Sequence, residues 1–105
     1  MSTEDFERMR KKARALEKNV ELAKKSLAGK VLEGRAAGGR IVARVSGDQT
    51  LLSIEIADEV IDRARAAELK AMILEAVNDA LGRSKDLAQV TLARAAGGVR
   101  IPGLL

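Results

Sequence analysis

Residues 40–56 read RIVARVSGDQTLLSIEI, and this stretch decides the fold class. On both sides of Gly47-Asp48, a pair typical of a tight turn, apolar residues alternate with polar or smaller ones. This period-two pattern predicts two strands that each bury one face. Another strand is expected to begin at Val31, so residues 30–57 are predicted to form a three-stranded antiparallel meander covered on one face.

A long helix is predicted before this sheet, over residues 2–28. Ser2 or Thr3 can cap its start, and Gly29 is a stop signal at its end. Its apolar residues recur with spacings of 3 and 4, which is the a/d seam of a coiled coil. The seam consists of Phe6, Met9, Ala13, Leu16, Val20, Ala23 and Leu27. We expect it to meet another helix over part of its length; the alternative is an ordinary amphipathic helix lying on a sheet.

The pattern becomes helical again over residues 60–95, beginning near Val60 or Ala66. Gly82 and Ser84 interrupt this pattern, which predicts a kink or break near residue 82. The face expected to be buried holds Leu69, Ile73, Ala76, Ala80, Leu87 and either Val90 or Thr91. With residues 96–105 as a tail, residues 1–105 are predicted to form a single α+β domain.

The composition excludes several kinds of chemistry. The 105 residues include no His, Cys, Trp or Tyr, and Phe6 is the one aromatic residue. No Ser-His-Asp or Cys-His relay, thiol redox couple or His/Cys zinc site can therefore form. Base stacking on an aromatic platform is not expected either. Asp58, Glu59 and Asp62 are the only candidates for an acid-residue enzyme or a cation site, and they are interpreted as first-turn acids of a helix.

No catalytic residue, metal, cofactor or small-molecule substrate is therefore expected. No run of 18 apolar residues occurs, and residues 1–12 lack the apolar core of a leader peptide, so no membrane association is expected. Eighteen of the apolar residues are Ala, which bury little area each, so a second copy of the chain is expected to complete the core. The predicted core or dimer seam comprises Phe6, Met9, Leu16, Val20, Leu27, Ile73, Val77 and Asn78.

The positive charge is concentrated in the first helix. The chain carries a net charge of +4, and residues 1–30 alone hold nine basic and five acidic residues. Lys11, Lys18 and Lys25 fall at heptad position f, opposite the seam and about 10 Å apart along the helix axis. This spacing is comparable with that of phosphates several nucleotides apart. Position f also commonly faces solvent in coiled coils, so the pattern leaves both a DNA-binding ridge and an ordinary helix surface open.

Four strings, in chain order, resemble the YbaB/EbfC family of bacterial nucleoid-associated proteins. They are residues 38–48 (GGRIVARVSGD), 52–56 (LSIEI) and 72–81 (MILEAVNDAL), and the ending with Gly97-Gly98 and residues 101–104 (IPGL). The resemblance spans the whole chain. It implies a homodimer whose projecting helices bind duplex DNA with little or modest sequence preference. It also implies a protein that is not an enzyme and that acts in the cytoplasm, on the nucleoid.

The leading hypothesis is a dimeric protein that contacts the phosphates of duplex DNA with low sequence specificity. The residues expected to contact DNA are Arg8, Lys11, Arg14, Lys18, Lys25, Arg35, Arg40, Arg94 and Arg100. The alternative is a protein-interaction module that docks a partner helix on the seam of the first helix and does not bind DNA.

Overall fold

The computed structural model describes residues 2–97, which form a helix, a sheet and a second helix in chain order. The elements are α1 (Thr3–Ala28), β1 (Val31–Ala36), β2 (Ile41–Ser46), β3 (Leu51–Ile56) and α2 (Ala66–Ala95). The strands are antiparallel and lie in the order β1-β2-β3. Short 3₁₀ turns occupy Ala37–Gly39, Asp58–Val60 and Arg63–Arg65. The predicted α+β class and the three-stranded antiparallel sheet are confirmed.

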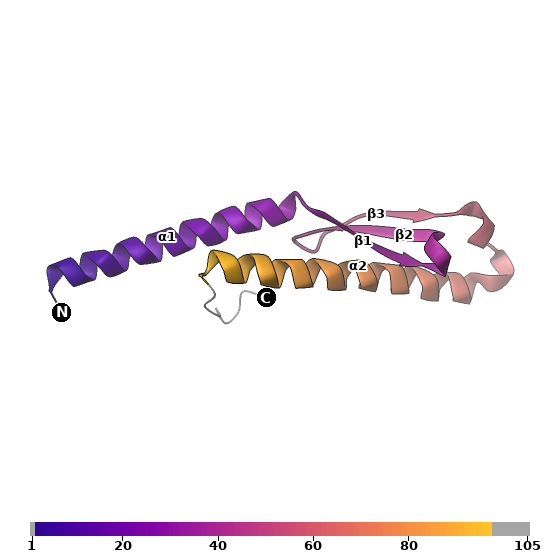
Figure 1. Cartoon of the computed structure of the whole chain (residues 1–105). Coiled ribbons are helices and arrows are strands. Elements are labelled where there is room, and N and C mark those ends of the chain that lie inside the picture. The colour runs from indigo at the N-terminus through magenta and orange to yellow at the C-terminus, as the bar shows by residue number, and fades with distance from the viewer. Residues whose placement is uncertain (1, 98–105) are drawn as a thin grey trace.

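The molecule is elongated because α1 extends beyond the end of α2 (Figure 1). The radius of gyration is 19.9 Å, against about 13 Å for a compact domain of this length. Ser2 caps α1 by accepting a hydrogen bond from the Asp5 backbone N–H, at 3.3 Å. At the other end, the Gly29 N–H donates to the Ser26 carbonyl at 3.2 Å. The two ends of α1 therefore follow the local signals in the sequence.

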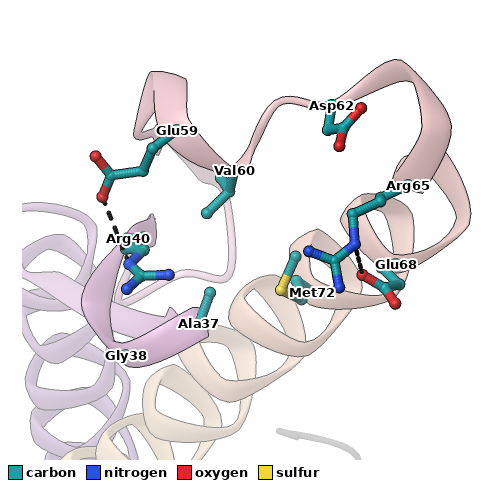
Figure 2. Close-up of a pocket in the computed structure, with 9 residues that line it drawn as sticks. All are labelled: Ala37, Gly38, Arg40, Glu59, Val60, Asp62, Arg65, Glu68 and Met72. Carbon is teal, nitrogen blue, oxygen red and sulfur yellow. Dashed lines mark ion pairs between the residues drawn. The ribbon is translucent and has the colours of Figure 1, made fainter.

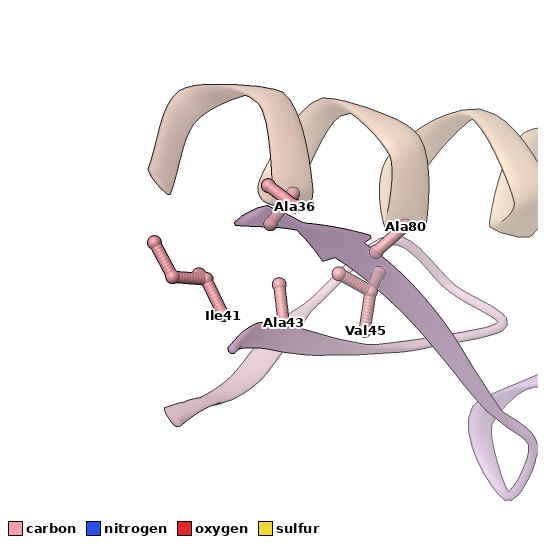
Figure 3. Packing of buried hydrophobic residues seen from close by; sticks show 6 residues of the cluster. Ala36, Ile41, Ala43, Val45 and Ala80 are labelled. Carbon is pink, nitrogen blue, oxygen red and sulfur yellow. The ribbon is translucent and has the colours of Figure 1, made fainter. Parts of the chain in front are cut away.

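The core lies between α2 and one face of β1 and β2. Ile41, Ala43 and Val45 of β2 are fully buried, as their alternation predicts. Figure 3 shows their side chains on the side of the sheet that faces α2, beside Ala36 of β1 and Ala80 of α2. Most of the buried side chains are small, so the helix and the sheet lie close together.

Gly34 of β1 marks the point of closest approach to α2. A Cβ atom at this position would overlap the Ala76 carbonyl oxygen and the Ala80 backbone nitrogen and would lie 2.9 Å from the Ala80 Cα. Only a glycine allows the two backbones to come this close. The α2 residues that face the sheet at this point are alanines because larger side chains would push the layers apart.

The predicted break near residue 82 is wrong, because α2 runs without interruption from Ala66 to Ala95. Gly82 lies on the exposed side of the helix, and the Ser84 side chain is fully buried. A glycine inside a helix costs about 1 kcal/mol relative to alanine. The buried residues of α2 form a stripe along one side of the helix: Ala76, Ala80, Ser84, Ala88 and Leu92. Packing of this stripe against the sheet and α1 outweighs that cost. The helix begins at Ala66, the later of the two predicted starts.

The predicted buried face of α2 is correct only in its first half. Ala76 and Ala80 are buried, but the stripe then continues at intervals of four residues through Ser84, Ala88 and Leu92. Of the residues expected there instead, Leu87 and Thr91 are half-buried and Val90 is exposed. The physical reason is that different partners cover the two halves: Gly34 of β1 lies against Ala76 and Ala80, whereas Ser84 contacts the β2–β3 turn and Ala88 and Leu92 pack with Leu27 of α1.

The seam of α1 contacts a helix over part of its length, as expected. Its C-terminal part, Val20, Ala23 and Leu27, packs on a small cluster formed by α2. Toward the N-terminus the seam leaves α2, and Phe6 and Met9 are more than half exposed. No helix among residues 2–97 has a stretch long and apolar enough to cross a membrane.

Candidate nucleic-acid interface

The basic residues of α1 lie along a helix that is exposed for most of its length. Its less exposed residues are Leu16, Val20, Ala23 and Leu27, all on the seam. The predicted DNA-contacting residues of α1 are fully on its exposed surface: they are Arg8, Lys11, Arg14, Lys18 and Lys25. We call Lys11, Lys18 and Lys25 the lysine column. Because the seam faces α2, the lysine column faces away from the rest of the protomer.

Few acidic groups neutralise this charge. Arg8 lies 4.0 Å from Asp5, and Lys25 lies 3.9 Å from Glu21, both as exposed pairs. Pairs of this kind contribute little to stability and exchange readily with other partners. Within residues 2–97, no acidic side chain comes within ion-pair distance of Lys11, Arg14 or Lys18, the three predicted contacts that lie between these two pairs. These groups are therefore available to an anionic partner.

The arginines of the sheet lie in a different environment. Arg35 pairs with Glu33 at 3.5 Å, and Arg44 pairs with Glu33 at 3.2 Å and with Glu55 at 2.7 Å. The hydrogen bond from Arg44 to the Glu55 carboxylate raises the arginine's pKa above its ordinary value. This face of the sheet is thus an ion-pair network in which each arginine already has a carboxylate partner. Arg35, predicted to contact DNA, is part of this network.

Arg40 lies in a pocket between the 3₁₀ turns and the start of α2 (Figure 2). Its Nε is 3.5 Å from a Glu59 carboxylate oxygen, and across the pocket Arg65 pairs with Glu68 at 3.0 Å. Asp62 adds a third carboxylate to the lining. Three acidic groups face two basic groups, so the pocket does not favour a phosphate. The positive charge of Arg40, a predicted DNA contact, is therefore neutralised by nearby carboxylates, in a pocket that no residue of α1 lines.

The remaining predicted site residues lie on α2 or outside the described part of the chain. Arg94 is exposed in the last turn of α2. Arg100 lies outside the described residues. Ile73 and Val77 are half-buried beside the core, whereas Asn78 is exposed in the protomer. The structure thus brings five of the nine predicted DNA-contacting residues together on α1, while Arg35, Arg40 and Arg94 belong to other parts of the described chain.

Two of the three acidic candidates at the sheet-to-helix connection, Glu59 and Asp62, have structural partners. Asp58 and Glu59 lie in a 3₁₀ turn, and Glu59 pairs with Arg40. The Asp62 carboxylate accepts a hydrogen bond from the Ala64 N–H at 3.0 Å and caps the next turn. In the part of the chain that the structure describes, no three His, Cys, Asp or Glu side chains are grouped as a metal site would require.

The sequence interpretation missed the junction between α1 and the core. The turn between β2 and β3, Ser46–Thr50, contacts the end of α1 on one side and Ser84 of α2 on the other. Within the turn, the Ser46 hydroxyl donates to Asp48 and lowers the pKa of that carboxyl below its ordinary value. The one sequence signal for this junction was Ser84, a polar residue among the small buried residues of α2.

Comparisons with known proteins agree with this arrangement of elements. A family model described as the YbaB/EbfC DNA-binding family matches residues 1–99. A protein named "Nucleoid-associated protein" from Alkaliphilus metalliredigens is 34% identical over 96 residues, covering 91% of this chain and 84% of that protein. A protein of the same name from Myxococcus xanthus is 37% identical over 94 residues, covering 90% of each.

Among solved structures, the crystal structure of an uncharacterised protein from Helicobacter pylori matches with a TM-score of 0.62. The two chains are 14% identical, and the match covers 74% of this chain and 90% of the other. At this identity the match shows a shared fold.

Proposed function

The chain belongs to the YbaB/EbfC DNA-binding family, and from that membership we propose that it binds duplex DNA as a homodimer through phosphate contacts made by α1. The resemblance recognised in the sequence is thereby confirmed, and the chain is a nucleoid-associated DNA-binding protein of the cytoplasm. The family is one of DNA-binding proteins, in line with the expectation that this chain is not an enzyme. The observation that carries the proposal is the lysine column on a projecting, exposed helix.

We infer low sequence specificity from the lysine column, whose ammonium groups are point charges without a bidentate geometry. Base edges are read best by bidentate groups placed in a groove, and phosphates are contacted by Lys and Arg without regard to sequence. The lysine column contains three ammonium groups, and Asn19 is the one amide side chain on α1. Binding is therefore dominated by charge, and the affinity depends on salt more than on base sequence.

The exposed area of the protomer favours a homodimer. The protomer exposes 7708 Å², against about 5,700 Å² for a compact monomer of its mass. The excess reflects the projecting α1, whose seam residues Phe6 and Met9 are left more than half exposed and would be covered by a second copy. Pairing would also bring two lysine columns to one DNA and double the charge available for phosphate contacts.

The surface around β3 is the best candidate for the dimer contact. Ile54 pairs with Ala43 and shares the apolar face of the sheet, yet it is 38% exposed because α2 packs on β1 and β2. Leu51, which pairs with Val45 on the same face, is also exposed. At the other edge of the sheet, β1, one backbone donor is already used, because the Arg35 N–H donates to the Asp79 carboxylate at 3.2 Å. A second copy would cover the apolar face of β3 and its open edge.

The proposal is tested by measuring DNA affinity against salt. With six lysines of the two columns on phosphates, log K should fall with log salt with a slope of about −5 or steeper. Fluorescence anisotropy with a random-sequence duplex, from about 50 to 200 mM salt, provides the measurement. No binding at low salt, together with capture of a stoichiometric protein partner by the seam, would instead support the protein-interaction module.

The dimer contact is tested by placing a charge on the apolar face of β3. Ile54→Lys should convert the dimer into monomers, because a buried unpaired ammonium group disfavours the contact. Light scattering coupled to size exclusion measures the mass directly. Val31→Lys is the matched control, since Val31 is an exposed apolar residue on the other edge strand. A dimer that survives Ile54→Lys but not Val31→Lys would place the contact on the β1 side.

A further inference from the structure

We propose that the β2–β3 turn, Ser46–Thr50, fixes the direction in which α1 projects and that Gln49 is the positioning residue of this junction. The inference rests on the proposed function, because the direction of α1 decides whether the lysine columns of a dimer reach the same duplex. The turn lies where the end of α1 and the middle of α2 meet, and it has specific contacts with both.

On the α2 side the turn is held by Ser84. This side chain is fully buried, and its hydroxyl donates a hydrogen bond to the Ser46 carbonyl at 2.7 Å. The same hydroxyl oxygen accepts a hydrogen bond from Gln49 Nε2 at 3.2 Å. Gln49 Nε2 also donates to the Gly47 carbonyl at 2.9 Å. One amide group thus joins the turn to α2 and to its own backbone.

On the α1 side the contact is made by backbone atoms. The Gly47 N–H donates to the Lys30 carbonyl at 3.1 Å, and the Lys30 N–H donates to the Leu27 carbonyl at 3.0 Å. A Cβ on Gly47 would overlap the Leu27 carbonyl oxygen and lie 3.0 Å from the Leu27 Cα. The last turn of α1 therefore rests directly on the turn, and a shift of the turn displaces the base of α1.

Gln49 occupies a conformation that its residue type disfavours. Its φ is +62°, in the left-handed region usually filled by Gly, Asn or Asp. Local preference does not account for a glutamine at this position. Its amide reaches Ser84, which the shorter Asn or Asp side chain would not do from the same backbone. The bond to α2 compensates for the backbone strain, which is typical of a residue held by its surroundings.

The position of the junction amplifies small changes. α1 has 26 residues and is therefore about 39 Å long. A tilt of about 10° at its base would move residue 7 by roughly 5 Å. This displacement is larger than the tolerance of a hydrogen bond to a phosphate. Loss of about one charge-assisted phosphate bond corresponds to roughly tenfold weaker DNA binding.

The test compares Gln49→Asn with the wild type. Asn accepts the left-handed backbone, so the turn is retained, but its side chain is too short to reach Ser84. Because the chain has no cysteine, spin labels can be attached at Glu7→Cys on α1 and Ala93→Cys on α2. Labelled chains are diluted with unlabelled ones so that distances within one protomer are measured by pulsed electron resonance, without DNA.

Gln49→Asn should shift or broaden the label distance by about 5 Å and weaken DNA binding roughly tenfold. Ser84→Ala should have at least as large an effect, because it also removes the hydrogen bond to the Ser46 carbonyl. Adding Gln49→Asn to it should have little further effect, because the Gln49–Ser84 bond is already lost. Gln89→Asn, the same chemical change on the exposed side of α2, should alter neither quantity.

Two results would overturn the inference while leaving the proposed function intact. One is an unchanged label distance in Gln49→Asn and Ser84→Ala. The other is a changed distance with unchanged DNA affinity, which would show that the direction of α1 does not govern binding. Failure of the proposed function itself would be visible separately, as weak and salt-independent DNA binding by the wild-type protein.

Discussion

Replacing Lys11, Lys18 and Lys25 together by alanine should flatten the dependence of DNA affinity on salt by up to about five units of slope per dimer. The expectation follows from six lost phosphate contacts, each of which releases about 0.9 of a counterion on B-form DNA. The three side chains are exposed on one face of α1, so their removal does not disturb the core. The slope of log K against log salt on a random duplex is the quantity to measure.

A matched control separates the location of the charge from its amount. Lys70, Lys85 and Arg63 are exposed basic residues outside α1, and their replacement by alanine removes the same total charge. That variant should keep most of the wild-type slope. Equal slopes for the two triple variants would mean that overall charge governs binding. A slope that is unaffected by loss of the lysine column would move the DNA-binding surface to another part of the protein.

Gly34→Ala should destabilise the protein by about 3 kcal/mol or more, an unusually large effect for the addition of one methyl group. The new Cβ would meet the backbone of Ala76 and Ala80, which cannot rotate away as a side chain could. β1 would have to separate from α2, and the fully buried residues of the core would lose contacts. The midpoint of urea unfolding, at a fixed protein concentration, measures the change.

The same substitution elsewhere in the chain is expected to have the opposite sign. A Cβ on Gly82 would meet nothing within 4 Å, and Gly82 lies in the interior of α2. Gly82→Ala should therefore stabilise the protein by up to about 1 kcal/mol, because alanine is the better helix former. Comparable stabilities for the two variants would show that the helix and the sheet are not held at the distance described.

Local features of the fold could be predicted from the sequence. The alternation in β2, the Gly47-Asp48 turn signal and the serine cap of α1 each depend on neighbouring residues, and each has its expected structure. The second half of α2 could not be predicted in the same way. Its buried residues Ser84, Ala88 and Leu92 are covered by the β2–β3 turn and by Leu27 of α1, contacts between distant parts of the chain that hydrophobic periodicity does not reveal.

In the candidate interface, too, features that depend on neighbouring residues could be predicted and features that depend on distant contacts could not. The heptad placed the lysine column opposite the seam because helix geometry relates positions within a few turns. The ion pairs of Arg35 and Arg40 involve carboxylates placed by strand pairing and by the 3₁₀ turns, so composition alone did not reveal them. Gln49 had no signal at all, because its left-handed backbone and its bond to Ser84 arise only in the folded chain.

The two edges of the sheet differ, and in the proposed dimer this difference would limit how many copies assemble. At the β1 edge the Asp79 carboxylate occupies the Arg35 N–H, a donor that an incoming strand would need. A third copy would therefore have no equivalent edge on which to continue the sheet. In the proposed dimer, contact through β3 is self-complementary about a two-fold axis and closes on itself. The sheet then ends at a defined pair of chains instead of extending into a fibre, which leaves the number of DNA-binding helices fixed.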